Sequence, residues 1–359
     1  MSKIRVGVIG AGSWVVASHL PNLQRHAGEL ELVAISRQGS EPLERLRRQF
    51  GFRVASEDYR DVLDAGIDVA VVASPTALHF EHAMAALSAG AHVLCEKPFT
   101  LSASEAWQLV ELAKEVEREL IVSFGWNYRP MLRQAKRLAD EVGIGQIEHV
   151  SIHMSSSTRE LLSGGTYPQA DPDTVPEVRT WNDPRLSGGG YAQGQLSHAF
   201  GMAFWLWNLR ASEVFALMSA PLGGDVEQHD AMAIRYDGGA IGSVAGGSAH
   251  IGAMGDKHAV VVRAIGAHGQ MHVDVERERV WLYRPDGTDI ELSLDDDAGW
   301  YDCIGPIDAL VAAAKGEPVD NCSPGELGAR TVEAIELAYR SAAKGRLASR
   351  QELESGAAP

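Results

Sequence analysis

The sequence is poor in cysteine, in long apolar runs and in positive charge. Its three cysteines, Cys95, Cys303 and Cys322, are an odd number without metal-ligand spacing, so we expect no disulfide framework, no bound metal and a reducing, cytoplasmic location. The longest aromatic and apolar run, residues 199–207, is too short to span a bilayer, and we expect no export signal. The net charge of −16 argues against a nucleic-acid partner. We therefore expect a protein that acts on a small molecule, away from membranes.

Short apolar strands alternate with helical segments over the first third of the 359 residues. We expect these strands at residues 4–9, 30–35, 53–54, 68–73, 92–95 and 120–124. The alternation predicts an α/β fold with a doubly wound parallel sheet of the Rossmann type in residues 1–126. The carboxyl ends of its strands should meet at one edge, where Gly12, Ser36, Ser74 and Lys97 would converge.

From about residue 146 the strands become longer and alternate between apolar and polar residues. They are expected at 147–155, 213–218, 231–236, 240–249, 258–265 and 269–283, with helices at 196–206, 304–315 and 324–343. This pattern predicts a second, α+β domain, residues 127–345, with a large, mostly antiparallel open sheet. We expect a long loop at 163–184, which could cover a ligand, and a tail at 346–359.

The first strand leads into Gly10-Ala11-Gly12, followed by Ser13 and Trp14 and then a helical pattern. Glycines in such a turn let the backbone approach a pyrophosphate, which the amino terminus of the helix then attracts. The third position of this fingerprint is Val15 instead of a small residue, so the helix must pack less closely on the strand or shift. A dinucleotide cofactor is the expected ligand.

The second strand ends in Ser36 and Arg37, where a fold that prefers NAD typically has an acidic residue for the ribose hydroxyl. The Arg37 guanidinium can pair with a 2′-phosphate, so NADP(H) is the preferred cofactor and NAD(H) a possible one. The alternative is that Arg37 is a surface arginine, as part of a cluster with the arginines of the next helix.

The stretch from His92 to Pro98 is an apolar strand that ends in Glu96-Lys97-Pro98. It places a carboxylate and an ammonium where an α/β sheet meets its ligand, which makes Lys97 the first candidate for chemistry. A solvated lysine in a loop is the alternative for an arbitrary lysine at the end of a strand.

Taken together, these segments resemble the Gfo/Idh/MocA family of NAD(P)-dependent oxidoreductases over nearly the whole chain. The most specific part is Glu96-Lys97-Pro98 in its context. The matching segments are residues 10–14, 19–21, 74–76 with His79 and His82, 90–98, 125–129, Trp181, 188–190 and His198.

The resemblance implies that Lys97 is the catalytic lysine near the nicotinamide. It also implies a homodimer or homotetramer that assembles through the second sheet. The cofactor-binding residues that we expect are Gly10, Gly12, Ser13, Trp14, Ser36, Arg37, Ser74, Pro75, Thr76, His79, Glu96, Lys97, Asn127 and Trp181.

The chain departs from the family pattern after the glycine triplet. The family has an aspartate, a histidine four residues later and a second aspartate three residues after that; here these places hold Gly194, His198 and Gly201. Gln193 and Gln195 flank the first gap and can bind hydroxyls, but they cannot act as bases. We therefore expect Lys97 and His198 to share the proton, while hydride passes to or from the nicotinamide.

The expected substrate is a neutral polyhydroxylated ring, because flat aromatic faces and amides suit such a ligand. An anionic substrate is less attractive for so acidic a protein, although Arg129 and Arg179 could supply local charge. The substrate-binding candidates are Trp126, Tyr128, Tyr191, Gln193, Gln195 and Tyr301.

We therefore predict an NADP(H)-dependent oxidoreductase that interconverts a secondary alcohol and a carbonyl of a sugar, a cyclitol or a related polyol. One alternative is an enzyme that oxidises a sugar transiently and retains the reduced cofactor. The other is a nicotinamide-binding sensor or scaffold that no longer turns over.

Overall fold

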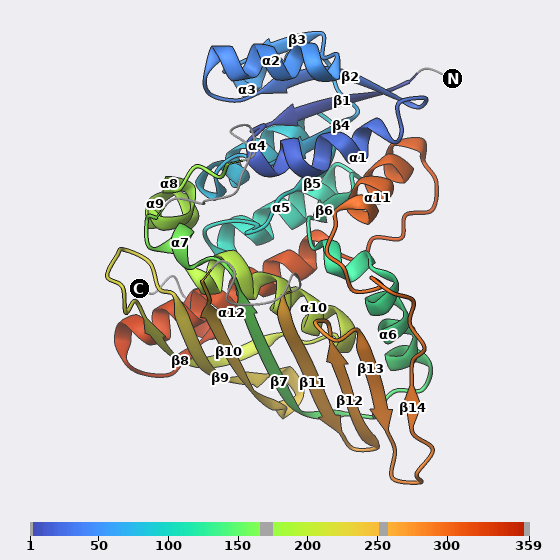
Figure 1. Cartoon of the computed structure of the whole chain (residues 1–359), viewed down its shortest axis with the longest axis vertical. Helices are drawn as coiled ribbons and strands as arrows, with labels where there is room; N and C mark the ends of the chain where they lie inside the picture. Colours follow the sequence, from blue (N-terminus) through green and yellow to red (C-terminus); the bar gives the residue numbers. More distant parts are fainter. Residues whose placement is uncertain (1–2, 166–174, 251–257, 355–359) are drawn as a thin grey trace.

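The computed structural model describes residues 3–165, 175–250 and 258–354. The first part of the chain forms a six-stranded, fully parallel sheet in the order β3-β2-β1-β4-β5-β6, shown in blue to teal in Figure 1. Its strands are β1 Ile4–Ile9, β2 Leu30–Ser36, β3 Val54–Ser56, β4 Val69–Val72, β5 His92–Cys95 and β6 Leu120–Val122. This order confirms the doubly wound sheet, in which the strand order runs outward in opposite directions from β1 and from β4.

Helices connect these strands: α1 Leu20–Gln24, α2 Ser40–Phe50, α3 Tyr59–Asp64, α4 His79–Ser88 and α5 Ala103–Glu115. Helix α5 begins with a capping box, because Ser102 accepts from the Glu105 backbone and the Glu105 side chain reaches back. The turn before α1 is a π-helix, Val15–His19, and Val15 is buried. A π turn is one residue wider than an α turn, which gives Val15 the room that a small residue would not need.

The second sheet has nine strands in the order β14-β13-β12-β11-β7-β10-β9-β8-β15. Only the β7–β10 pair is parallel, so the sheet is mostly antiparallel, as predicted. The strands are β7 Ile147–Ser156, β8 Ala211–Ser219, β9 His229–Tyr236, β10 Ile241–Ser248, β11 Ala259–Gly266, β12 Gly269–Asp274, β13 Arg279–Tyr283, β14 Ile290–Glu291 and β15 Ala348–Ser349.

Helices cover one face of this sheet, whereas the other face is open (Figure 1). The covering helices are α6 Pro130–Glu141, α10 Ser197–Trp207 and α12 Gly325–Lys344. Strand β9 alternates strictly between buried and exposed residues, as a strand with one covered face should. Large apolar side chains, among them Phe215, Leu217 and Ile241, are exposed on the sheet.

Two late helices return to the first domain. Helix α11, Ile304–Lys315, packs against β1, β4 and β5, and its Ile307 and Leu310 share a core with Val6 and Val8. Helix α12 packs against α5 on one side and β8 on the other. Residues far along the chain therefore cover part of the six-stranded sheet.

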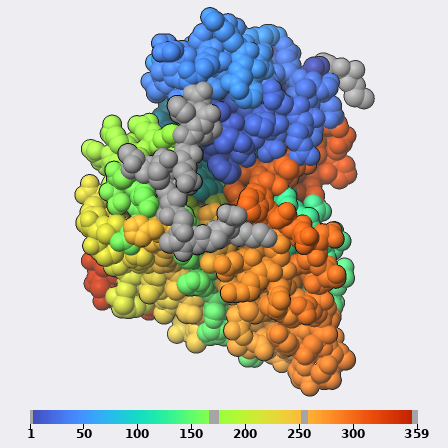
Figure 2. Space-filling view, in the orientation of Figure 1, coloured from blue at the N-terminus to red at the C-terminus, as the bar shows by residue number. Residues whose placement is uncertain are grey.

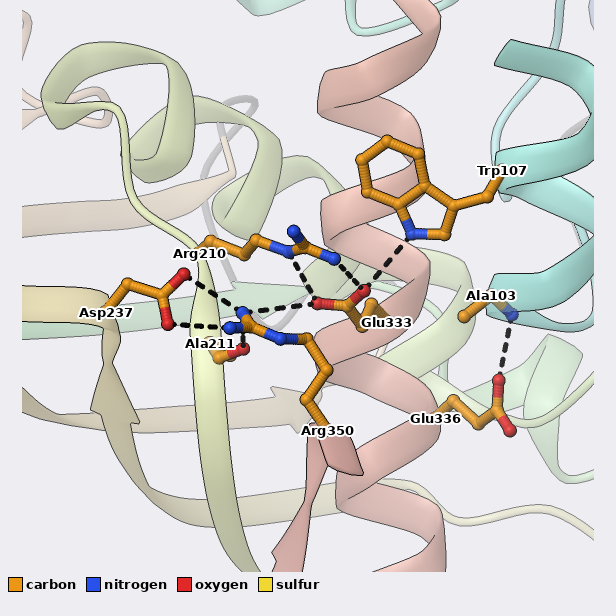
Figure 3. A network of polar contacts seen from close by, with 8 residues as sticks. All are labelled: Ala103, Trp107, Arg210, Ala211, Asp237, Glu333, Glu336 and Arg350. Carbon is orange, nitrogen blue, oxygen red and sulfur yellow. Dashed lines mark hydrogen bonds and ion pairs between the residues drawn. The ribbon is translucent and has the colours of Figure 1, made fainter. Parts of the chain in front are cut away.

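A buried carboxylate on α12 joins these parts of the protein (Figure 3). Glu333 accepts from the Arg210 guanidinium at 2.9 and 2.8 Å and from the Trp107 indole at 3.1 Å. One turn later Glu336 accepts from the backbone N–H of Ala103, the first residue of α5, at 2.8 Å. These contacts fix α12 between the two domains.

Two loop expectations need correction. Residues 348–354 form β15, which pairs with β8, and α13, Arg350–Glu354, instead of a tail. The Arg350 guanidinium, paired with Asp237 at 2.9 Å, fastens this segment to the second sheet. Within the expected loop, α8, Arg179–Asn182, is helical, and α9, Pro184–Ser187, begins at its end. Residues 166–174 and 355–359 lie outside the described residues. Among the helices that the structure describes, none has the length and apolarity needed to cross a bilayer.

Candidate active site

The two domains meet along a recess that the space-filling view shows between the blue first domain and the green to orange second domain (Figure 2). Gly10, which follows β1, has a φ of +84°, and a Cβ there would lie 2.3 Å from the backbone nitrogen of Ser74. The backbone N–H groups of Gly10 and Ala11 both donate to the carbonyl of Ser36 at 2.9 Å. Only glycine permits this close approach of three strand ends.

Gly12 differs from Gly10, because it is exposed and a Cβ added there would meet nothing closer than 4.0 Å. The space above its backbone is therefore open to a ligand, as a pyrophosphate would require. Trp14 is also exposed, and its ring lies 5.8 Å from that of Tyr301. Ser13 is half-buried at the start of the same turn. These residues suit a dinucleotide, and they connect its expected place to the second domain.

The other expected cofactor residues line the same edge. Ser36 and Thr76 are buried, and Pro75 is half-buried. Arg37 is half-buried at the end of β2, and its Nε donates to the carbonyl of Gln38 at 3.4 Å. The Ser74 hydroxyl lies 2.9 Å from Nδ1 of His82.

His79 is occupied by the protein itself. Its Nε2 lies 2.7 Å from the carbonyl of Ser74, and its Nδ1 lies 2.8 Å from the carbonyl of Pro98. The imidazole thus connects the loop after β4 to the loop after β5. His79 therefore holds the segment that carries Lys97 in place, and its contact with the cofactor stays a prediction.

Lys97 follows β5 and reaches across the recess to the second domain. Its Nζ donates to the carbonyl of Gly194 at 3.3 Å and lies 5.7 Å from the centre of the Trp181 ring. Burial lowers the pKa of Lys97, although the negative charge of Glu96 opposes this shift. A lysine whose pKa is lowered can give up or take a proton closer to neutral pH.

Glu96 is buried beside it, and its Oε1 lies 2.7 Å from Nε2 of His19. Burial acts to raise the pKa of Glu96, but the His19 hydrogen bond and the positive charges of His19 and Lys97 lower it overall. Cys303 lies close by, and burial raises its pKa to about 11. The atoms of His19, Glu96 and Cys303 that could coordinate a metal ion, a ring nitrogen, a carboxylate oxygen and a sulfur, lie within 4.8 Å of one another. Their hydrogen bonds to one another, to Ser123 and to Tyr301 already engage them.

His198 lies on α10, and aromatic rings from other parts of the chain surround it. Its ring centre is 5.0 Å from that of Trp126 and 5.2 Å from that of Tyr301. Burial holds the pKa of His198 well below its ordinary value, and the charges of Lys97 and His258 lower it further. Its Nδ1 is buried without a hydrogen-bond partner. Among the described residues no carboxylate bonds to this histidine, and its lowered pKa makes it a weak base.

His258, which precedes β11, is not among the site residues predicted from the sequence. Its ring packs edge-on against Trp126 at 5.5 Å, on the same indole as His198. Burial lowers the pKa of His258 to about 4, and the charge of Lys97 acts in the same direction. No motif in the sequence marks this histidine, because only the fold brings the start of β11 to the recess.

The two missing carboxylates leave different surroundings. At Gly194 an added Cβ would lie 3.7 Å from the Trp181 ring, which is ordinary contact. At Gly201 it would lie 2.9 Å from the Phe124 ring, so the ring would have to move. The first position could accept a side chain, whereas the second is filled by the core.

Several expected ligand-binding side chains instead face the protein interior. Tyr128 accepts from the Ser323 hydroxyl at 3.0 Å, and Tyr191 is fully buried and accepts from Ser156 at 3.0 Å. The amide of Asn127 donates to the carbonyl of Cys322 at 3.1 Å. An aromatic or amide residue in a loop gives no sign of which way it will point, and these three point into the core. Their roles in ligand binding stay predictions.

The remaining candidates lie around the recess. Trp126 is buried, and its indole N–H donates to the carbonyl of Gly299 at 3.0 Å, so only its ring is offered to the site. The Gln193 amide donates to the carbonyl of Thr100 at 3.0 Å. Gln195 is buried nearby, and Tyr301 is half-buried.

A second pair of carboxyl groups lies behind the glycine triplet. Glu227 accepts from the backbone N–H groups of Gly190 and Ala192 and from the Tyr339 hydroxyl at 2.8 Å. It therefore holds the start of η4, Ala192–Leu196, the π-helical turn that carries Gly194 and leads into α10. Asp230 is also buried, and neither of its carboxyl oxygens finds a hydrogen-bond partner among the described residues. Burial, with the charge of Glu227, raises the pKa of Asp230 to about 9.

Comparisons with known proteins bear on both domains. Residues 4–124 match the family model described as the oxidoreductase family with an NAD-binding Rossmann fold, and residues 132–272 match the GFO/IDH/MocA C-terminal domain. The levoglucosan dehydrogenase of Pseudarthrobacter phenanthrenivorans is 28% identical over 312 residues, covering 77% of this chain and 75% of that protein. An uncharacterized oxidoreductase of Synechocystis is 28% identical over 208 residues, which is 57% of this chain and about half, 52%, of that relative's length.

Solved structures show the same architecture. Levoglucosan dehydrogenase in complex with NADH and L-sorbose has a TM-score of 0.78 at 22% identity, covering 97% of this chain and 99% of that one. GenD2 from gentamicin A biosynthesis, in complex with NAD, has a TM-score of 0.74 at 25% identity, covering 97% of each chain. Among shorter matches, the D-xylose 1-dehydrogenase (NADP(+)) of Hypocrea jecorina is 33% identical over 141 residues, covering 37% of this chain and 36% of that protein.

Proposed function

We propose that the protein interconverts a secondary alcohol and a carbonyl of a sugar, a cyclitol or a related polyol. Its two domains match the two models of one family, so the chain belongs to the Gfo/Idh/MocA oxidoreductases, which are NAD(P)-dependent. The observation that carries the proposal is the position of Lys97. Its amine extends from the cofactor edge of the first sheet to the Gly194 carbonyl of the second domain. A bound nicotinamide would supply or accept the hydride.

The cofactor would lie along the carboxyl edge of the six-stranded sheet. The open backbone at Gly12 would face the pyrophosphate, and Ser36 and Arg37 would face the adenosine ribose. We propose a preference for NADP(H), with NAD(H) accepted, because Arg37 stands where an acidic residue would otherwise select the free hydroxyl. A comparison of the two cofactors in binding titrations, repeated with Arg37→Asp, tests this preference; the variant should bind NADP(H) less well than NAD(H).

We propose that Lys97 transfers the proton of the substrate hydroxyl and that His198 assists it. A Lys97 amine with a lowered pKa can accept the hydroxyl proton during oxidation and return it during reduction. Because Nδ1 of His198 is sealed without a partner, only its Nε2 is left to meet the substrate oxygen. His198 would thus direct the oxygen toward Lys97.

The decisive experiment follows the reduced-nicotinamide absorbance while the protein meets NADP⁺ or NAD⁺ with sugars and cyclitols, and NADPH or NADH with keto-sugars. We expect turnover that falls by about 100- to 10,000-fold in Lys97→Met, with cofactor binding retained. Lys136→Met on α6 is the control, because that lysine pairs with Asp140 away from the recess. A largely active Lys97→Met enzyme would overturn the assignment. Cofactor binding without net turnover would favour transient redox chemistry or a non-catalytic binder.

We also propose a cytoplasmic homodimer or homotetramer that assembles through the open face of the nine-stranded sheet. This face exposes Phe215, Ile241 and Leu217, the last with 64% of its surface accessible. Sedimentation should show an oligomer that Leu217→Glu dissociates. A monomeric wild-type protein would contradict the proposal.

A further inference from the structure

Two imidazoles lie beside Lys97 without a carboxylate partner. His198 and His258 pack edge-on against the Trp126 ring, at 5.0 and 5.5 Å between ring centres. Nδ1 of each ring is buried and makes no hydrogen bond, and the described residues provide no hydrogen bond for either ring. Since Nε2 of neither ring is sealed in this way, it is the nitrogen that each histidine offers to the recess.

The sealed nitrogens decide which form the neutral rings take. A buried N–H without an acceptor is rarer in proteins than an acceptor that lacks a donor. Both rings therefore keep the proton on Nε2 and leave Nδ1 bare. Each ring then presents an N–H donor to the recess.

Lys97 is the charged group that acts on both imidazoles. The groups that shift the pKa of His198 are burial, Lys97 and His258, and those that shift the pKa of His258 are burial and Lys97. Glu96 is the carboxylate that acts on Lys97, and it is already paired with His19. The family's carboxylate position is Gly194, whose carbonyl already accepts from Lys97. The Glu96 carboxylate and the Gly194 carbonyl, the acceptors nearest Lys97, are thus already engaged, whereas the two imidazole N–H groups are not.

We propose that the substrate is a sugar acid, a polyol that carries a carboxylate, and that His258 is the specificity residue that binds this carboxylate, while His198 keeps its place at the reacting oxygen. A carboxylate accepts hydrogen bonds at both of its oxygens and donates none, so it suits an imidazole that presents an N–H group and has no acceptor among the described residues. Because the whole protein carries a net charge of −16, an anion needs such a local set of donors in order to bind. This inference rests on the proposed oxidoreductase function, and it replaces the neutral ring that the sequence favoured.

Matched sugar pairs test the proposal, because D-galacturonate and D-galactose, or D-glucuronate and D-glucose, differ only in a carboxylate. We expect kcat/KM with NADP⁺ to be at least about tenfold higher for the acid of the preferred pair. His258→Gln should lower kcat/KM for the acid by about 10- to 100-fold, mainly through KM, while the Kd for the cofactor is unchanged. His272→Gln is the folding control, because that half-buried imidazole lies on β12 beside Trp281. Equal or better turnover of the neutral sugars, or an equal loss for both sugars in His258→Gln, would overturn the proposal.

Binding gives a readout that does not depend on turnover. Calorimetry of the cofactor-loaded protein in buffers of different ionisation enthalpy counts protons taken up with the sugar acid. The imidazoles are neutral at pH 7, and a bound carboxylate raises their pKa, so we expect proton uptake that His258→Gln reduces. Lys97, Glu96, Cys303 and Tyr301 also face this region and are unchanged in that variant. If no sugar is turned over but the acid binds in a His258-dependent way, the oxidoreductase function fails and the anion site stands. If the acid does not bind, the anion site fails as well.

Discussion

The buried Asp230 lowers the free energy of unfolding near neutral pH, and a single substitution should remove this effect. Its pKa is 3.8 in an exposed aspartate and about 9 in the folded protein, because burial and the charge of Glu227 both disfavour the carboxylate. Between these two values the folded state binds a proton that the unfolded state lacks. Stability therefore falls as pH rises through this range, at about 1.4 kcal/mol per pH unit. At pH 7 the accumulated cost is on the order of 4 kcal/mol.

Asp230→Asn has nearly the same shape and no proton to take up. We expect it to raise the free energy of unfolding by about 2–4 kcal/mol at pH 7, less at pH 5 and more at pH 9. The gain is smaller than the full cost because an amide without partners also loses hydration on burial. Below about pH 4 the two proteins should be nearly equally stable, since the aspartate is then protonated in both states.

Urea unfolding at pH 5, 7 and 9, followed by tryptophan fluorescence, measures this difference. Asp64→Asn is the matched control, because Asp64 is exposed at the end of α3 and should leave stability within about 0.5 kcal/mol. A variant that is no more stable than the wild type, with the same dependence on pH, would refute the reasoning. It would mean that Asp230 is ionised in the folded protein.

Glu333→Gln should lower the free energy of unfolding by about 2–4 kcal/mol, because the Arg210 guanidinium would lose its buried counter-charge. Glu336→Gln weakens one hydrogen bond to the start of α5, so it should cost about 1 kcal/mol in the same denaturation assay. Equal effects of the two substitutions would contradict the role of Glu333. Gly194→Asp should fit beside Trp181 and place a carboxylate near Lys97, which raises the pKa of that amine. The pH profile of kcat/KM for alcohol oxidation should then move upward by about one unit or more, while Gly194→Asn leaves it in place. In wild-type protein, alcohol oxidation should lose rate as pH falls through the lowered pKa of Lys97, because protonation removes the base; a flat profile in this range would argue against Lys97.

The sequence alone determined the fold class, because hydrophobic period and turn residues are local properties. The alternation of short apolar strands with helices predicted the parallel sheet, and longer alternating strands predicted the second sheet. Glu96-Lys97-Pro98 also pointed to the cofactor edge, since a residue that follows a parallel strand must lie there. The capping box at Ser102 was readable for the same reason.

Only the tertiary structure decided what surrounds these residues. His258 reaches Trp126, and Gly194 reaches Lys97, through contacts between segments about a hundred or more residues apart. Tyr128 and Tyr191 showed the same aromatic pattern as a ligand site, but packing turned them inward. The return of α11 to the first sheet and the burial of Asp230 likewise depend on long-range packing. Periodicity fixes which face of an element is buried, whereas the identity of its neighbour, and hence the charge and basicity of a site, arises only when the two domains close on each other.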